Sequence, residues 1–185
     1  MPTLPKIHKT ETVARSRLFR VEAIDLEFSN GEQRTYERLA SGGGYGAVLV
    51  VPMLDDDTVL MIREYAGGTE RHELCLPKGK VDAGETFLEA ANRELMEEVG
   101  YGAHDIQNLK AVSLAPGYMG HRTNLLLARD LYPATAEGDE PEPLEVVPMK
   151  LSELDQIVAM DECSEGRSLL ALYLVRDLLR REAAT

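Results

Sequence analysis

The chain has 185 residues, 44% of them hydrophobic and 28% charged, which is the size and composition of one ordinary globular domain. Its formal net charge of −12 argues against unaided binding to nucleic acid or to an anionic membrane, because both require a positive protein surface. No apolar run is long enough to span a bilayer and the N-terminal residues lack the apolar core of a signal peptide, so we expect a cytoplasmic protein that binds neither nucleic acid nor membranes.

The first predicted element is an antiparallel hairpin. Residues 18–28 (LFRVEAIDLEF) and 33–39 (QRTYERL) have the composition of strands. Residues 29–31 between them (Ser-Asn-Gly) are a strong turn signal. A two-stranded hairpin is marginally stable alone, so we expect it to need a further surface on which to pack.

A glycine-rich segment, residues 41–46 (SGGGYG), follows the hairpin. It is not a phosphate-binding P-loop, because the required Gly-Lys-Ser/Thr does not follow. We interpret it as a flexible connector. The predicted organisation is therefore an N-terminal hairpin region (1–42), which we expect to be a dimerisation element, and a main domain (43–185).

The remaining elements mix strands with helices. Apolar, β-branched segments predict strands at residues 47–54, 58–65, 72–77, 106–115, 123–131 and 144–150, and helical periodicity predicts helices at residues 86–99 and 165–182. Residues 132–143 (YPATAEGDEPEP) are predicted to form an acidic loop, because their three prolines exclude a helix or a central strand. This order predicts an α/β fold in which a mixed β-sheet is sandwiched between helices (α/β/α).

The first of these helices concentrates acidic residues on one face. Thr86 is a suitable N-cap, with Glu89 three residues later, and Gly100 ends the helix. At about 100° per residue, one arc holds the apolar residues Leu88, Ala91, Leu95 and Val99. A separate narrow arc holds the acidic residues Glu94, Glu97 and Glu98. The acidic arc has two interpretations. It is either a solvated face, where like charges repel by only roughly 1 kcal/mol, or a site for a divalent cation, since hard cations prefer oxygen ligands.

The wider spacing favours the second interpretation. From Gly79 the sequence continues with five residues, Glu85, seven residues, and then Arg-Glu-Leu-Met-Glu-Glu-Val-Gly-Tyr, ending at Tyr101. This pattern resembles the signature of the Nudix hydrolases, G-x5-E-x7-R-E-U-x-E-E-x-G-U, where U is apolar and usually aliphatic. Every fixed position is met, and Tyr101 departs mildly from the aliphatic preference. The resemblance implies a Nudix fold and metal-dependent hydrolysis of nucleoside diphosphates linked to another moiety.

The resemblance also implies a role for each matching residue. The implied ligands of the cofactor, Mg²⁺ or Mn²⁺, are Glu94, Glu97, Glu98 and the backbone carbonyl of Lys78. Structural support of the signature is implied for Gly79, Glu85, Arg93 and Gly100. Glu85 and Arg93 are expected to pair and so to brace the turn between the loop and the helix. The implied reaction is attack by water on a phosphorus atom of the substrate.

Segments beyond the signature resemble the ADP-ribose diphosphatase subgroup of the family. They include ETVARSRLF, IREYAGGTE and EGDEPEPL. The implied substrates are ADP-ribose, short diadenosine polyphosphates and NADH, with AMP as a product. Members of this subgroup commonly exchange their N-terminal strands between subunits, so we expect a homodimer. The alternative is a hairpin that packs on its own subunit.

The acidic loop supplies candidates for the general base. In ADP-ribose diphosphatases a glutamate from a mobile loop beyond the signature takes this role, and a close neighbour can contact a metal ion. By this resemblance Glu140 is the expected base and Glu142 an auxiliary metal ligand. If the loop has no catalytic part, Glu98 is the first candidate for the base. A solvated loop is the alternative interpretation.

Arg63 is a candidate for substrate binding. Relatives carry a basic residue near this position that contacts the substrate phosphates. The alternative from sequence alone is a surface salt bridge from Arg63 to Glu64 or Glu73.

Two other functions fit parts of the sequence. One is a Nudix-like module that senses ADP-ribose without cleaving it, but such modules usually lose glutamates of the signature, and here all are present. The other is an RNA 5′-end pyrophosphohydrolase. It requires a basic surface along the RNA, and the net charge of −12 argues against it.

Overall fold

The computed structural model describes residues 2–40, 46–138 and 140–184. These described residues fall into two compact units, one within the bounds Met1–Gly44 and Ser113–His121 and the other within Tyr45–Val112 and Arg122–Thr185. The connector predicted at residues 41–46 lies outside the described residues except for Gly46. Within the described ranges, the helices are all too short or too polar to cross a membrane.

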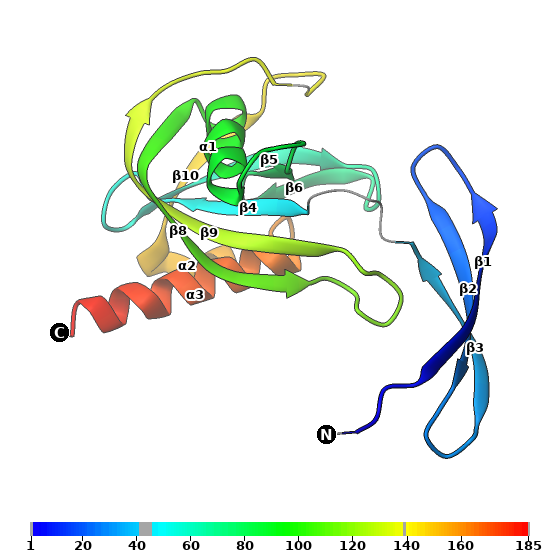
Figure 1. Cartoon of the computed structure of the whole chain (residues 1–185). Coiled ribbons are helices and arrows are strands. Elements are labelled where there is room, and N and C mark those ends of the chain that lie inside the picture. Colours follow the sequence, from blue (N-terminus) through cyan, green and yellow to red (C-terminus); the bar gives the residue numbers. More distant parts are fainter. Residues whose placement is uncertain (1, 41–45, 139, 185) are drawn as a thin grey trace. The chain divides into compact units, whose positions relative to one another are not determined.

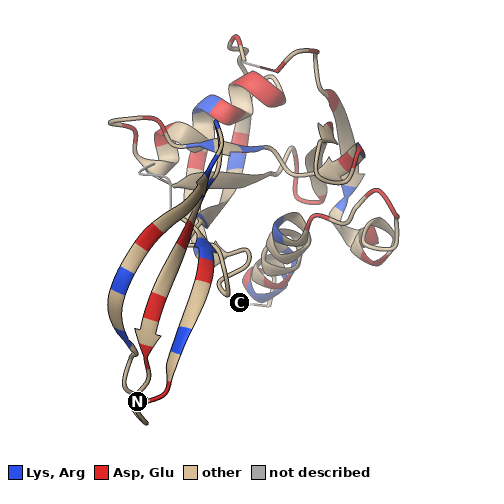
Figure 2. Cartoon of the chain, turned by 90° about the vertical axis from the view of Figure 1, so that its right-hand side faces the viewer, with Lys and Arg blue, Asp and Glu red and all other residues tan. Residues whose placement is uncertain are grey.

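The first unit contains a three-stranded antiparallel sheet in the order β1-β2-β3 (Figure 1). Its strands are β1 (Lys6–Arg15), β2 (Arg20–Glu27) and β3 (Gln33–Leu39). Strands β2 and β3 confirm the predicted hairpin, but the hairpin is part of a larger sheet because β1 pairs with β2. The sequence does not reveal β1, since all ten of its residues are exposed and show no alternation of buried and exposed positions. Basic and acidic residues are interspersed along these strands (Figure 2).

The second unit contains a four-stranded and a three-stranded sheet. Their orders are β7-β4-β9-β8 and β10-β5-β6. The strands are β4 (Ala47–Pro52), β5 (Thr58–Ala66), β6 (Arg71–Cys75), β7 (Lys78–Lys80), β8 (Tyr101–Ser113), β9 (Arg122–Pro133) and β10 (Glu145–Lys150). Strand β4 runs parallel to β9 and antiparallel to β7, so the four-stranded sheet is mixed.

Helices cover both faces of this sheet (Figure 1). They are α1 (Phe87–Glu98), the 3₁₀ turn η1 (Leu151–Glu153), α2 (Leu154–Ile157) and α3 (Gly166–Glu182). Because side chains alternate along a strand, Val48 and Val50 of β4 pack in the cluster that includes α1. Leu49 and Val51 pack in the cluster that includes α2 and α3. This confirms the predicted sandwich of a mixed sheet between helices.

Helix α1 begins and ends as its sequence predicts, and three of its four predicted apolar positions, Ala91, Leu95 and Val99, are buried. Thr86 caps it in a capping box with Glu89. The buried positions are Ala90, Ala91, Glu94 and Leu95, whereas Leu88 is 46% exposed and does not anchor the helix as expected. The small side chains at positions 90 and 91 let α1 approach the sheet closely. It also brings Glu94 against Gly79 of β7.

Candidate active site

Strand β7 lies so close to α1 that one position must be a glycine. A Cβ atom at Gly79 would lie 2.0 Å from Glu94 Oε1, far inside van der Waals contact. The bare backbone of Gly79 therefore leaves the space that the Glu94 carboxylate occupies. Glu94 is itself only 7% exposed.

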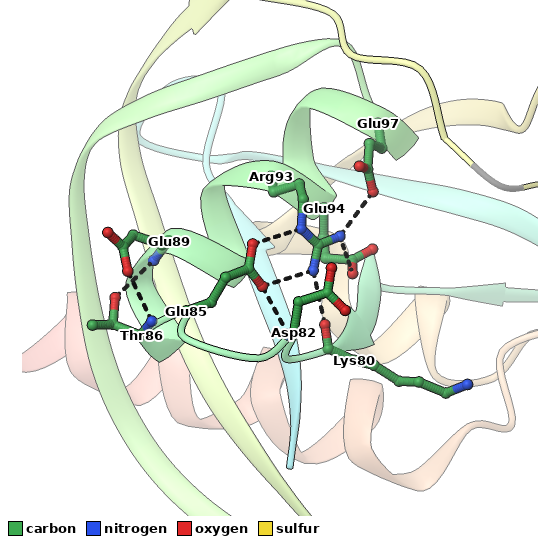
Figure 3. A network of polar contacts seen from close by, with 8 residues as sticks. All are labelled: Lys80, Asp82, Glu85, Thr86, Glu89, Arg93, Glu94 and Glu97. Carbon is green, nitrogen blue, oxygen red and sulfur yellow. Dashed lines mark hydrogen bonds and ion pairs between the residues drawn. The ribbon is translucent and has the colours of Figure 1, made fainter. Parts of the chain in front are cut away.

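Arg93 connects the loop before α1 to the acidic face of the helix (Figure 3). Its Nε and Nη2 donate to the two oxygens of Glu85 at 2.8 and 3.1 Å, and Nη2 also donates to the backbone oxygen of Lys80 at 2.8 Å. Its Nη1 donates to Glu94 Oε1 at 2.8 Å and to Glu97 Oε2 at 3.0 Å. The hydrogen bond from Arg93 is the main reason that the pKa of Glu85 lies below its ordinary value. Arg93 and Glu85 are thus joined in the bidentate arrangement that a brace requires.

The carboxyl group of Glu98 has a strongly perturbed pKa. Burial is the largest cause and raises its pKa to about 8, although the backbone N–H of Lys78 opposes the shift. That N–H donates to Glu98 Oε2 at 2.9 Å. A carboxyl group with a raised pKa holds a proton at neutral pH until a cation arrives to favour the ionised form.

The acidic face of α1 opens into two cavities with shared walls, of about 210 Å³ and about 790 Å³. Both are lined by Glu94, Glu97, Glu98, Gly138 and Glu140. Glu142 lines the smaller cavity, and Lys78 and Gly79 line the larger. The structure therefore brings the acidic loop, which follows α1 by some 40 residues in the sequence, beside the signature glutamates.

These residues fit a divalent cation by their donor chemistry. Mg²⁺ and Mn²⁺ prefer carboxylate and carbonyl oxygens, and three carboxylates of α1 meet in one pocket. Two of them, Glu94 and Glu97, already converge on a single positive group, Nη1 of Arg93. Within the described residues, no three acidic, His or Cys side chains are already arranged as a closed metal site.

Arg63 lies in a different charge cluster from the signature glutamates. Its Nε and Nη2 donate to Glu162 at 3.1 and 3.0 Å, and its Nη1 donates to Glu145 at 2.6 Å. Glu145 is the cross-strand neighbour of Arg63 in the β10–β5 pair. The sequence suggests a salt bridge from Arg63 to Glu64 or Glu73, but neither forms. Glu64 pairs with Lys78, and Glu73 pairs with Arg71. Glu64 follows Arg63 on the strand, so its side chain points to the opposite face of β5.

One cluster beside the site has no signal in the sequence. The ammonium group of Lys78 donates to Glu64 and lies 3.4 Å from Cys75 Sγ. The family signature implies a role only for the backbone carbonyl of Lys78. No local spacing relates the Lys78 side chain to Glu64, which lies 14 positions earlier on another strand. Burial raises the pKa of the Cys75 thiol to about 12, and both Cys75 and Cys163 are free and buried.

Known proteins resemble the whole chain. A sequence model of the NUDIX domain matches residues 45–172, and one of the NudE-type Nudix hydrolase N-terminal domain matches residues 5–38. The chain is 51% identical over 176 residues to the ADP compounds hydrolase NudE of Escherichia coli (strain K12), covering 95% of this chain and 94% of that protein. It is 28% identical over 173 residues to the ADP-ribose pyrophosphatase of Bacillus subtilis (strain 168), covering 90% of this chain and 92% of that protein. A crystal structure of an ADP compounds hydrolase matches with a TM-score of 0.94 and 48% identity, covering 100% of this chain and 99% of that chain.

Proposed function

The chain belongs to the Nudix hydrolase family, and from this premise we propose that it hydrolyses the diphosphate linkage of ADP compounds and releases AMP. The observation that carries the proposal is the complete set of signature glutamates, Glu94, Glu97 and Glu98, lining one pocket. The 51% identity to an ADP compounds hydrolase over 95% of the chain supports the substrate class. Within that class we propose ADP-ribose, short diadenosine polyphosphates and NADH.

Nudix hydrolases generally need divalent metal ions, and for this chain we propose Mg²⁺ or Mn²⁺. The residues that would hold the cation are Glu94, Glu97, Glu98, the backbone carbonyl of Lys78 and, from the loop, Glu142. When bound, such a cation neutralises charge on the phosphoryl oxygens and favours ionisation of the attacking water.

The chain's own groups position the reactants and move the proton. The Arg93–Glu85 pair keeps the loop and α1 in register, and the N–H of Lys78 fixes one oxygen of Glu98. We propose that Glu140, which lines both cavities, accepts the proton of the attacking water as general base. Glu98 is the alternative base. 

Arg63 stays a proposal for phosphate binding. Its guanidinium group is held by Glu145 and Glu162, which use three of its five N–H donors, so the two remaining donors would contact a phosphate.

Two wider features belong to the proposal. We propose a homodimer that includes the N-terminal sheet, because this sheet buries few apolar side chains of its own. We also propose the cytoplasm as the location, supported by two free cysteines and no disulfide within the described residues.

An assay for AMP tests the proposed reaction. The protein is incubated with Mg²⁺ and ADP-ribose, and the products are separated by chromatography. AMP release is expected, and a Glu98→Gln variant, which keeps volume but removes charge, is expected to lose on the order of 10²-fold or more in kcat while remaining folded. Binding of ADP-ribose without AMP would instead support a sensor. A parallel incubation with a triphosphorylated RNA tests whether the protein is instead an RNA 5′-end pyrophosphohydrolase.

A further inference from the structure

A largely buried ion pair lies beside the acidic face of α1. The Lys78 ammonium group on β7 donates to Glu64 Oε2 on β5. Only 18% of the Lys78 side chain and 26% of the Glu64 side chain are exposed. A charge removed from water needs a partner of opposite sign. Glu64 is therefore the group that stabilises this ammonium in its place.

The same lysine belongs to the pocket of the signature glutamates. Its backbone N–H donates to Glu98 Oε2 at 2.9 Å, and Lys78 lines the larger cavity. A positive side chain here repels a divalent cation, and salt screens the repulsion poorly because the groups are partly buried. The carboxylate of Glu64 cancels that positive charge at hydrogen-bonding range.

We propose that Glu64 neutralises Lys78 and thereby sets the affinity of the pocket for divalent cations, without itself binding the cation. This inference rests on the proposed function, because it presupposes a cation at Glu98 and its neighbours. Glu64 is absent from the lining of both cavities, and its carboxylate is turned toward Lys78. These two observations favour charge balance over direct coordination.

Binding of Mn²⁺ to the substrate-free protein tests the proposal. Free Mn²⁺ is measured by electron paramagnetic resonance for the wild type, Glu64→Gln, Lys78→Met and the double variant. Glu64→Gln leaves the ammonium uncompensated and is expected to raise the Kd for Mn²⁺ by about tenfold or more. Lys78→Met removes the repelling charge and is expected to lower the Kd. The double variant restores neutrality and is expected to bind within about threefold of the wild type.

The double variant separates charge balance from coordination. If Glu64 were a ligand, Lys78→Met would not rescue Glu64→Gln, and a double variant as weak as Glu64→Gln would overturn the proposal. Unchanged affinity in folded Glu64→Gln would also overturn it. Circular dichroism establishes folding, because breaking a buried pair is destabilising. If Glu64→Gln does not fold, the proposal is tested with Lys78→Met alone. An unchanged affinity of this variant for Mn²⁺ would then overturn the proposal.

Strand β6 offers a matched control. Glu73 is the cross-strand partner of Glu64, pairs with Arg71 rather than Lys78 and lines neither cavity. Glu73→Gln is expected to leave Mn²⁺ affinity unchanged, and a loss equal to that of Glu64→Gln would overturn the specific role of Lys78.

The wild type must also release AMP from ADP-ribose. A wild type that binds no Mn²⁺ and releases no AMP overturns the proposed function together with this inference. An active wild type with an unaffected Glu64→Gln variant overturns this inference alone.

Discussion

At the scale of single residues, Gly79 shows how a missing side chain makes room for a functional one. A Cβ atom at this position would lie 2.0 Å from the nearest oxygen of Glu94, so alanine must displace either β7 or the carboxylate. We expect Gly79→Ala to lower kcat by about 10²-fold or more, because a displacement of about 1 Å in a catalytic site has effects of this size. The measurement is kcat for ADP-ribose at saturating Mg²⁺, with circular dichroism to verify the fold.

Gly68 is the matched control for this substitution. A Cβ atom there would meet no atom within 4 Å, and no left-handed backbone conformation is required. Gly68→Ala is expected to change kcat by less than about twofold, as surface substitutions usually do. Wild-type turnover in a folded Gly79→Ala variant would contradict the functional role of the Glu94 position.

The residues of the signature are predictable because their spacing is local, but the ion pairs around them are not. Helical periodicity places Glu94, Glu97 and Glu98 on one face from the sequence alone. The Arg63–Glu162 pair, by contrast, joins residues 99 positions apart, and the pairing of Lys78 with Glu64 depends on how β7 meets β5. Such contacts depend on how the strands pack in three dimensions, and this packing cannot be read from the spacing of residues in one sequence.

At the scale of elements, the loop between β9 and β10 carries the candidates for proton transfer and additional metal binding. Glu140→Gln is expected to lower kcat by about 10²-fold if Glu140 is the general base. Glu142→Gln is expected to raise the Mg²⁺ concentration needed for half-maximal activity by about tenfold. Both are assayed with ADP-ribose across a Mg²⁺ titration. If neither variant loses tenfold in kcat at saturating Mg²⁺, the loop has no catalytic part and Glu98 becomes the first candidate for the base.

A second element-scale feature ties β6 to the segment that follows α2. Arg71 Nε donates to Glu73 Oε1 at 2.8 Å, and Ser164 Oγ donates to Glu73 Oε2 at 2.9 Å. The hydrogen bond from Arg71 is the main cause that lowers the pKa of Glu73 to about 2. Because the folded pKa lies below the ordinary value of 4.5, ionised Glu73 stabilises the fold above that value. This stabilisation is lost as the pH falls toward 2.

We therefore expect a pH-dependent difference between the wild type and Glu73→Gln. At neutral pH the variant should be less stable by about 1 kcal/mol, since the lost hydrogen bonds involve a charged group. The difference should shrink as the pH falls from about 4.5 toward 2. Urea unfolding at a series of pH values measures it. A difference that stays constant over this range would show that Glu73 acts by packing rather than by its charge.

The helices and strands are predicted correctly where burial produces a recognisable pattern of apolar residues in the sequence. Strand β4 and the first half of β5 are continuous buried runs, and α1 has both a cap and a helical period. Strand β1 carries no such signal because none of its residues is buried. The helical projection of α1 correctly places Ala91, Leu95 and Val99 on the buried face, but it misses the burial of Ala90 and Glu94.

At the scale of the whole molecule, the two units differ in how much apolar surface they bury. Both large hydrophobic clusters belong to the second unit. Among the described residues of the first unit, the buried hydrophobic side chains are Ile24 and Leu26 alone. The register of the strands places Ile7 opposite Leu26 and Tyr36 opposite Ile24 on one face, and Ile7 and Tyr36 are 53% and 48% exposed. We call these four side chains the apolar face of the N-terminal sheet.

We expect the apolar face to be covered in a homodimer, because a three-stranded sheet needs a packed hydrophobic face for its stability. Light scattering at micromolar concentration should then give twice the chain mass of 20.5 kDa. Tyr36→Glu places a charge on this face and should shift the protein toward the monomer, since an unpaired buried charge is costly. Gln33→Glu adds the same charge to the opposite face of β3, as strand alternation requires, and should leave the mass unchanged. A wild-type mass near 20.5 kDa would reject the homodimer, and equal dissociation by both variants would reject the apolar face as its interface.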